Sequence, residues 1–274
     1  FEIHVIGTPS EESLDGGKNE MAAHGGFDHI DVAFMVHGST LTQLETPSLA
    51  LIEMDVEFHG KTAHAGIAPY AGRSAVDAVT MLQTGLGLMR NHLKDSSRVS
   101  NIVLAGGTAV NSVPDFAKVK VEIRHSSMAY LESVEQWTRE IAQAAAMATQ
   151  TQVQITPVAH IYNTTINDAM GALLMERAEK FACDGIAPPR KDCGSTDFGA
   201  VTHRLPSCCL RVKTIETNDP PHTDAWVKTG KEARAHQGIY DGAVCCALAA
   251  FRLVTDEAAW QDVYQCFLAH QKEN

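Results

Sequence analysis

The sequence predicts an α/β domain that is interrupted by an inserted α+β domain, and three observations support this fold class. Continuous apolar runs, which are typical of buried parallel strands, occupy residues 1–7 and 32–37. Between residues 52 and 163 the predicted strands instead alternate apolar and polar positions, as antiparallel strands with one solvated face do. After this insertion the sequence again contains continuous apolar runs. We therefore expect a mixed, mainly parallel sheet with helices on both faces, built from residues 1–51 and 164–274.

The first α/β segment is expected to contain a strand, a helix and a second strand. The run FEIHVIG ends at a Gly-Thr-Pro turn and is predicted to be a buried strand. Residues 13–27 are predicted to be helical and to stop at Gly25 and Gly26. Glu11 and Glu12 lie between these elements, where the first turn of a helix favours acidic side chains. The order predicts a right-handed βαβ unit.

The insertion contains two predicted helices and four predicted strands. The strands are expected at residues 50–60, 99–107, 117–127 and 152–159, and the helices at residues 74–93 and 130–150. This βαββαβ order predicts a ferredoxin-like fold with both helices on one face of an antiparallel sheet. The α/β domain then continues with a helix at residues 168–182, a strand at 207–215 and a helix at 231–254. Because the first residue already lies in a predicted buried strand, we expect an N-terminal portion of this domain to be missing.

Composition excludes several classes of protein. The net charge of −11 disfavours nucleic acid and anionic membranes as partners. No apolar run approaches the roughly 18 residues that a membrane span requires. The seven cysteines are odd in number, lie in the last third of the chain and include no CxxC pair. This pattern indicates reduced thiols and therefore a cytoplasmic protein.

Several polar residues follow predicted strands of the α/β domain and could carry chemistry. Glu12, His37 and His222 are ligand types for Zn²⁺ or Mn²⁺, which the sequence does not distinguish. Glu11, a second carboxylate beside a ligand, is placed to act as a general base for metal-bound water. Asp197 lies in a Gly-bounded loop. The spacing alone leaves ordinary roles open, such as helix-start acids, a loop histidine and a turn aspartate.

The insertion holds a second group of unusual residues. His64 lies among small residues after a predicted strand, and Asn111 follows a Gly-Gly pair. Arg124 lies near the end of an alternating strand. Arginine together with asparagine makes a good anchor for a carboxylate, because the guanidinium group pairs with it through two hydrogen bonds. The alternative is that Asn111 caps a turn and Arg124 is a surface charge.

The motifs GTPSEE, VHGS, GKTAHAGIAPYAGRSAVDAV, GGTAVNSVPDFAKVKVEIR, GSTDFGAVTHRLPS and PHTDAW occur in this order along most of the chain. Together they resemble the two-metal amidohydrolase and carboxypeptidase family, which includes aminoacylases, glutamate carboxypeptidases and auxin-conjugate hydrolases. The likeness is closest to the branch of the p-aminobenzoyl-glutamate hydrolases and Xaa-Arg dipeptidases. The resemblance implies a catalytic domain at residues 1–51 and 164–274 and a lid and dimerisation domain at residues 52–163.

The resemblance also implies a role for each matching residue. Glu11 matches the general base, and Glu12, His37 and His222 match metal ligands. In the insertion, His64 matches the lid histidine that polarises the scissile carbonyl in the active site of the partner subunit. Asn111 and Arg124 match the residues that hold the substrate carboxylate. The family uses two Zn²⁺ or Mn²⁺ ions and forms homodimers through the lid.

The implied reaction is hydrolysis of an amide bond in an N-acyl amino acid, an aminobenzoyl-glutamate-like conjugate or a dipeptide with a free carboxylate. One departure from the family pattern is that its N-terminal His/Cys-Gly-His-Asp/Asn stretch does not occur in these 274 residues. We therefore expect this chain alone to bind metal poorly and to be inactive. The alternative is a non-catalytic homologue that regulates or pairs with an active subunit.

Overall fold

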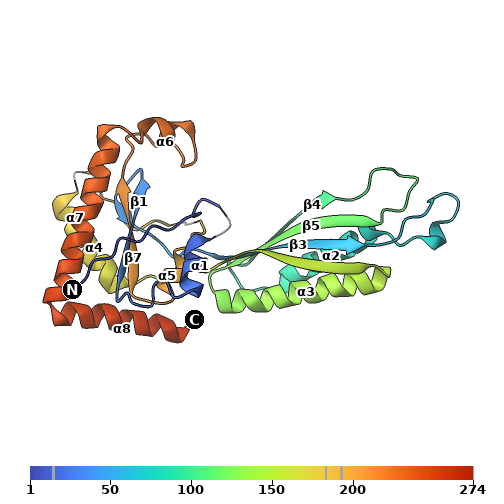
Figure 1. Ribbon diagram of the computed structural model, residues 1–274, viewed down its shortest axis with the longest axis horizontal. Helices are drawn as coiled ribbons and strands as arrows, with labels where there is room; N and C mark the ends of the chain where they lie inside the picture. The colour runs from blue at the N-terminus through green and yellow to red at the C-terminus, as the bar shows by residue number, and fades with distance from the viewer. Residues whose placement is uncertain (14–15, 183, 192–193, 274) are drawn as a thin grey trace. The chain divides into compact units, whose positions relative to one another are not determined.

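The computed structural model describes residues 1–13, 16–182, 184–191 and 194–273. The chain divides into two compact units (Figure 1). The first unit contains Phe1–Pro9, Gly17–Ser48 and Thr164–Asn274, and the second contains Ser10–Gly16 and Leu49–Asn163.

The second unit is a four-stranded antiparallel sheet with two helices. Its elements are β3 (Ala50–His59), α2 (Ala75–Met89), β4 (Arg98–Ala105), β5 (Phe116–His125), α3 (Met128–Thr149) and β6 (Gln152–Ile161), with single 3₁₀ turns at Pro69–Ala71 and Arg90–His92. The strand order is β4-β5-β3-β6, and every neighbouring pair is antiparallel. The predicted ferredoxin-like insertion is therefore confirmed.

Alternation along β5 explains why one face of this sheet carries the helices. Val119, Val121 and Ile123 are fully buried and pack with Leu82 of α2 and Leu131 of α3. Side-chain oxygens of serine residues cap both helices: Ser74 accepts from Asp77 N, and Ser127 accepts from Tyr130 N. The intervening β5 side chains lie on the opposite face, so that face remains available for polar contacts.

The first unit is built around a small mixed sheet. Its strands are β1 (Ala33–Ser39), β2 (Gln43–Leu44) and β7 (Ser207–Lys213), in the order β1-β7-β2. β1 and β7 are parallel, whereas β2 and β7 are antiparallel. The helices are α1 (Gly17–Ala23), α4 (Asp168–Phe181), α5 (Gly199–Thr202), α6 (Asp224–Thr229), α7 (Ala233–Thr255) and α8 (Glu257–Glu273).

Helices α4 and α7 pack on one face of this sheet. Leu174 of α4, Leu210 of β7 and Ala249 of α7 are fully buried in one apolar cluster. By length and composition alone, α7 could also cross a membrane, with a mean hydropathy of 1.4. Its residues Cys245, Ala249 and Leu253 are buried in the same cluster, and 33 % of the apolar stretch is buried in the structure.

The prediction for the first residues of the chain is wrong in two respects. Residues 1–7 form no strand, and Phe1, Ile3 and Val5 are exposed, so the predicted βαβ unit does not form here. No strand among the described residues pairs with this segment, and an apolar run without a pairing partner does not become a buried strand. Glu11 and Glu12 lie in a turn, not in the first turn of a helix, because α1 begins only at Gly17.

Candidate functional site

Glu11 and Glu12 lie in the stretch Ser10–Gly16, which groups with the second unit. Glu11 is half-buried and Glu12 is exposed. Ser10 precedes them with φ of 59°, in the left-handed region that non-glycine residues rarely adopt. Such backbone conformations are concentrated at functional sites. The two neighbouring carboxylates therefore lie on a sharply turned loop.

His37 lies two residues before the end of β1, on the edge strand of the first unit's sheet. Its Nδ1 atom lies 2.6 Å from the carbonyl oxygen of Gly38 and 3.0 Å from Nη1 of Arg211. Arg211 is the direct neighbour of His37 across the parallel β1–β7 pair. The imidazole is therefore in contact with a cationic side chain that the sequence interpretation did not consider.

Arg211 is held by a buried acid. Its Nε donates to Glu45 Oε2, and the Glu45 side chain is only 7 % exposed. Arg190 Nη1 lies 3.4 Å from the other oxygen of Glu45. Sequence reasoning missed Glu45 and Arg211. One signal could have drawn attention to Arg211, since it is the first charged residue within the apolar strand SCCLRVK.

His222 lies in the loop before α6 and is exposed, with φ of 63°. Asp197 was predicted to be a loop residue that could carry chemistry, but in the structure its side chain is buried and ion-paired. Its carboxylate is 1 % exposed and accepts from Lys18, at 3.0 Å from the backbone N and 2.6 Å from Nζ. Asp197 therefore anchors the start of α1 and has no exposed surface for a substrate.

His64 and Asn111 meet at one end of the second unit. They lie in the loops 60–73 and 106–115, which Figure 1 shows together beyond the ends of the strands. Ala65 N donates to Asn111 O at 2.9 Å, and Val113 N donates to Ala63 O at 2.8 Å. Both His64 and Asn111 are exposed. The structure thus brings these two predicted site residues together on one double loop.

Arg124 lies at the opposite end of β5. It lies eight positions after Phe116, the first residue of the strand, which corresponds to roughly 26 Å at about 3.3 Å per residue. Its guanidinium group makes a bidentate pair with Glu122, at 2.7 and 2.9 Å. Arg124 and Asn111 of one chain are therefore too far apart to bind the same carboxylate.

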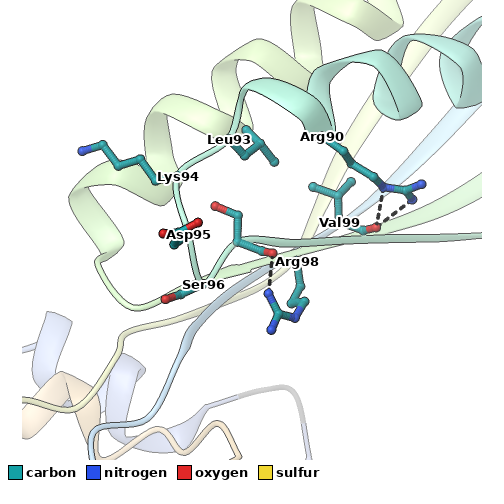
Figure 2. Close-up of a pocket in the computed structure, with 8 residues that line it drawn as sticks. Arg90, Leu93, Lys94, Asp95, Ser96, Arg98 and Val99 are labelled. Carbon is teal, nitrogen blue, oxygen red and sulfur yellow. Dashed lines mark hydrogen bonds between the residues drawn. The ribbon is translucent and has the colours of Figure 1, made fainter.

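A surface pocket of about 370 Å³ lies between the end of α2 and the start of β4 (Figure 2). Arg90, Lys94 and Arg98 line it, but Figure 2 shows their charged ends pointing in different directions. Arg90 donates to the carbonyl oxygen of Val99, at 2.8 Å from Nη2, and Arg98 to that of Ser97 at 2.8 Å. The pocket contains none of the predicted site residues.

The donor types Glu12, His37 and His222 fit a divalent metal ion chemically. The contact of His37 Nδ1 with the Gly38 carbonyl would leave Nε2 as the ligating atom, which is the usual arrangement for a metal-bound histidine. Within the described ranges, however, no three His, Cys, Asp or Glu side chains form a group that could hold a metal ion. The metal-ligand roles of Glu12, His37 and His222 therefore remain predictions.

Comparison with known proteins identifies the second unit. Residues 50–150 match the peptidase dimerisation domain. The chain is 32 % identical to Xaa-Arg dipeptidase of Mus musculus over 275 residues, which cover 99 % of this chain and 63 % of that protein. The chain thus spans less than two-thirds of this relative.

Solved structures show the same fold. An aminobenzoyl-glutamate utilization protein from Klebsiella pneumoniae matches with a TM-score of 0.70 at 21 % identity, over 89 % of this chain and 61 % of that one. A dinuclear metal-binding peptidase of the M20 family from Bacillus subtilis matches with a TM-score of 0.60 at 16 % identity, over 88 % of this chain and 64 % of that one. The motifs, the dimerisation domain and these likenesses together lead to one conclusion: residues 50–150 form the dimerisation domain of the M20 peptidases, and almost the whole chain is similar to an Xaa-Arg dipeptidase.

Proposed function

We propose that this protein hydrolyses an amide bond in an N-acyl amino acid, an aminobenzoyl-glutamate-like conjugate or a dipeptide that has a free carboxylate. The observation that carries the proposal is the similarity to Xaa-Arg dipeptidase, which extends over 99 % of this chain. All seven predicted site residues occur in this chain within their motifs. A non-catalytic homologue remains the second hypothesis, and the experiment below separates the two.

The proposed roles follow from the chemistry of each side chain. Glu11 acts as the general base that takes a proton from the attacking water and returns it to the leaving amine. Glu12, His37 and His222 are proposed metal ligands, and a bound divalent ion would lower the pKa of water towards neutrality. Zn²⁺ and Mn²⁺ both suit these ligands. His64 donates a hydrogen bond to the oxygen on which negative charge develops.

We further propose that the protein acts as a homodimer through its second unit. The match to a peptidase dimerisation domain supports this proposal. The positions of Asn111 and Arg124 at opposite ends of β5 support it as well, because a carboxylate held by both residues requires two copies of the chain. In such a dimer, His64 and Asn111 of one subunit would complete the site that contains Arg124 of the other.

The test compares wild type with Glu11→Gln in the protein as its gene encodes it, loaded with Zn²⁺ or Mn²⁺. Release of free amino acid from N-acyl amino acids and dipeptides is measured, and we expect turnover to fall by about 10²- to 10⁴-fold. Glu20→Gln, which changes an exposed acid in α1, is the matched control and should retain activity. Wild-type turnover by Glu11→Gln would overturn the base assignment. If the metal-loaded wild type hydrolyses none of these substrates, the non-catalytic hypothesis is favoured.

A further inference from the structure

The ring of His64 is held by the backbone of its own loop. Gly66 N donates to Nδ1 of His64 at 3.2 Å. The next two residues close the same turn, since Ile67 N and Ala68 N both donate to the carbonyl oxygen of His64, at 3.2 and 3.0 Å. The residues that follow His64 therefore fix both its backbone and one of its ring nitrogens.

The contact between Gly66 and His64 determines which nitrogen of the imidazole carries a proton. A backbone N–H group can only donate, so the nitrogen that accepts from it must present a lone pair. An imidazolium ion has an N–H group on both nitrogens and could not accept this bond. A neutral ring that accepts at Nδ1 carries its proton on Nε2. His64 therefore presents an N–H donor at Nε2.

The Nε2–H group of His64 is available to a ligand. His64 is exposed, and within the part of the chain that the structure describes its Nε2 atom meets no hydrogen-bond acceptor. The turn itself is held in place by the two backbone hydrogen bonds between loops 60–73 and 106–115 and by an antiparallel bridge between His64 and Ser112. A donor that is fixed in position before the reaction stabilises developing negative charge most effectively.

We propose that the backbone N–H of Gly66 holds His64 in the Nε2–H tautomer, so that Nε2 donates to the carbonyl oxygen of the substrate amide. Gly66 is a positioning residue in this proposal, since it acts through the ring of His64. In this tautomer Nε2 has no lone pair with which to accept a proton or coordinate a metal, so His64 serves as a donor and not as a base. The inference rests on the proposed function only for the substrate oxygen that Nε2 meets.

The first experiment determines the tautomer of His64 in the wild type by long-range ¹H–¹⁵N NMR. The metal-free protein carries ¹⁵N-labelled histidine and is measured at about pH 8.5, where histidine is ordinarily neutral. We expect Nε2–H for His64, whose signals are identified by their loss in His64→Gln. His24 is the internal control, because its Nδ1 lies 2.8 Å from the carbonyl oxygen of Glu20 and should therefore carry the proton.

A peptide of residues 62–68 gives the tautomer ratio of a solvated imidazole in the same sequence. We expect the ratio of Nε2–H to Nδ1–H in the protein to exceed that of the peptide by about two- to tenfold, the scale of a single hydrogen bond. A ratio equal to that of the peptide, or a His64 ring that carries its proton on Nδ1, would overturn the proposal.

The second experiment removes the donor. Gly66→Pro has no backbone N–H at this position, so its tautomer ratio should approach that of the peptide. Gly66→Ala is the matched change that keeps the N–H, and its Cβ would lie 3.5 Å from Cε1 of His64, an ordinary contact. We expect the wild-type ratio in Gly66→Ala.

The amide signals of Ala65 and Val113 show whether the paired loops persist in Gly66→Pro, because both groups donate across the loop pair. If the loops persist and Gly66→Pro keeps the wild-type ratio, the proposal is wrong. If the loops rearrange, the comparison of the wild type with the peptide decides alone.

Turnover separates this inference from the proposed function. In the Zn²⁺-loaded protein we expect kcat to fall further in Gly66→Pro than in Gly66→Ala, with KM nearly unchanged, because the bond from Nε2 strengthens in the transition state. Equal kcat values in the two variants would show that Nε2–H does not meet the reacting oxygen. The expected tautomers without hydrolysis by the wild type would sink the function alone. Hydrolysis by the wild type with a tautomer that does not depend on Gly66 would sink the inference alone.

Discussion

Lys18 Nζ lies 2.6 Å from Asp197 Oδ1, and the two side chains are only 8 % and 1 % exposed. The other oxygen of Asp197 accepts from the backbone N of Lys18, at 3.0 Å. One buried carboxylate therefore neutralises a buried ammonium group and binds an N–H group in the first turn of α1, where negative charge is favourable. This pair joins segments that are 179 residues apart in the sequence.

We expect Asp197→Asn to lower the free energy of unfolding by about 3–5 kcal/mol, because it leaves the Lys18 ammonium buried without a counter-charge. The measurement is urea unfolding followed by circular dichroism. The exposed pair of Lys180 and Glu176 provides the control, and Lys180→Ala should leave stability almost unchanged. Adding Lys18→Met to Asp197→Asn should restore part of the loss, since no buried charge then remains. No recovery in the double variant would contradict this account.

Two glycines of α2 should respond to alanine in opposite directions. A Cβ atom at Gly85 would lie 2.5 Å from Cγ2 of Ile141 in α3, which is too close for any packed pair. At Gly87 a Cβ would meet nothing within 4 Å. We therefore expect Gly85→Ala to destabilise the second unit by about 1–3 kcal/mol through overpacking. Gly87→Ala should stabilise it by up to about 1 kcal/mol, because alanine has the higher helix propensity.

Chemical denaturation of both variants tests this pair of expectations. The two sites are two residues apart in one helix, so any general effect of alanine on α2 is common to both. Equal effects of the two substitutions would show that the contact between Gly85 and Ile141 does not limit the approach of α2 and α3.

The insertion could be predicted from sequence because its strands alternate. Val119, Val121 and Ile123 are buried, whereas the residues between them are polar, and this two-residue period specifies both the strand and its buried face. The first residues lack such a constraint. FEIHVIG is apolar enough for a buried strand, but burial requires a neighbouring strand, and the described residues supply none.

For the candidate site, the sequence predicts residue types but not the contacts between them. The motifs identified Glu11, His37, His64 and the other candidates, but contacts between distant residues are not encoded in local spacing. Arg211 meets His37, 174 positions away in the sequence, because β1 and β7 pair in parallel. Likewise, only the length of β5 reveals that Asn111 and Arg124 of one chain cannot share a ligand.

The buried thiol of Cys208 makes stability depend on alkaline pH. Desolvation raises the pKa of Cys208 from 9.0 to about 12, and the side chain is 7 % exposed. Between these values the unfolded chain has lost the thiol proton while the folded chain retains it. The unfolded state then binds fewer protons, so stability falls as pH rises, by about 1.4 kcal/mol per pH unit for one thiol.

We expect the free energy of unfolding to decline less steeply between pH 9 and 11 in Cys208→Ala than in the wild type. Urea unfolding at a series of pH values, with a reducing agent present, measures this slope. A cavity left by the smaller side chain shifts the whole curve but does not alter its slope. Parallel curves for the two proteins would show that Cys208 titrates alike in both states.

The proposed dimer should depend on the edge strand β4 of the second unit. Ile102, Val103 and Leu104 are exposed along it, and an edge strand with apolar side chains is a template for pairing with another chain. The opposite edge, β6, contains Pro157, which cannot donate to a neighbouring strand. A second copy is therefore expected to add to β4.

Ile102→Lys places a charge on the β4 edge, and we expect it to shift the protein from dimer towards monomer. Val158→Lys, a matched change on β6, should leave the dimer intact. Light scattering coupled to size-exclusion chromatography measures both masses across a range of protein concentrations. If Val158→Lys dissociates the dimer and Ile102→Lys does not, pairing occurs through β6. If neither does, contacts away from both sheet edges hold the two copies together.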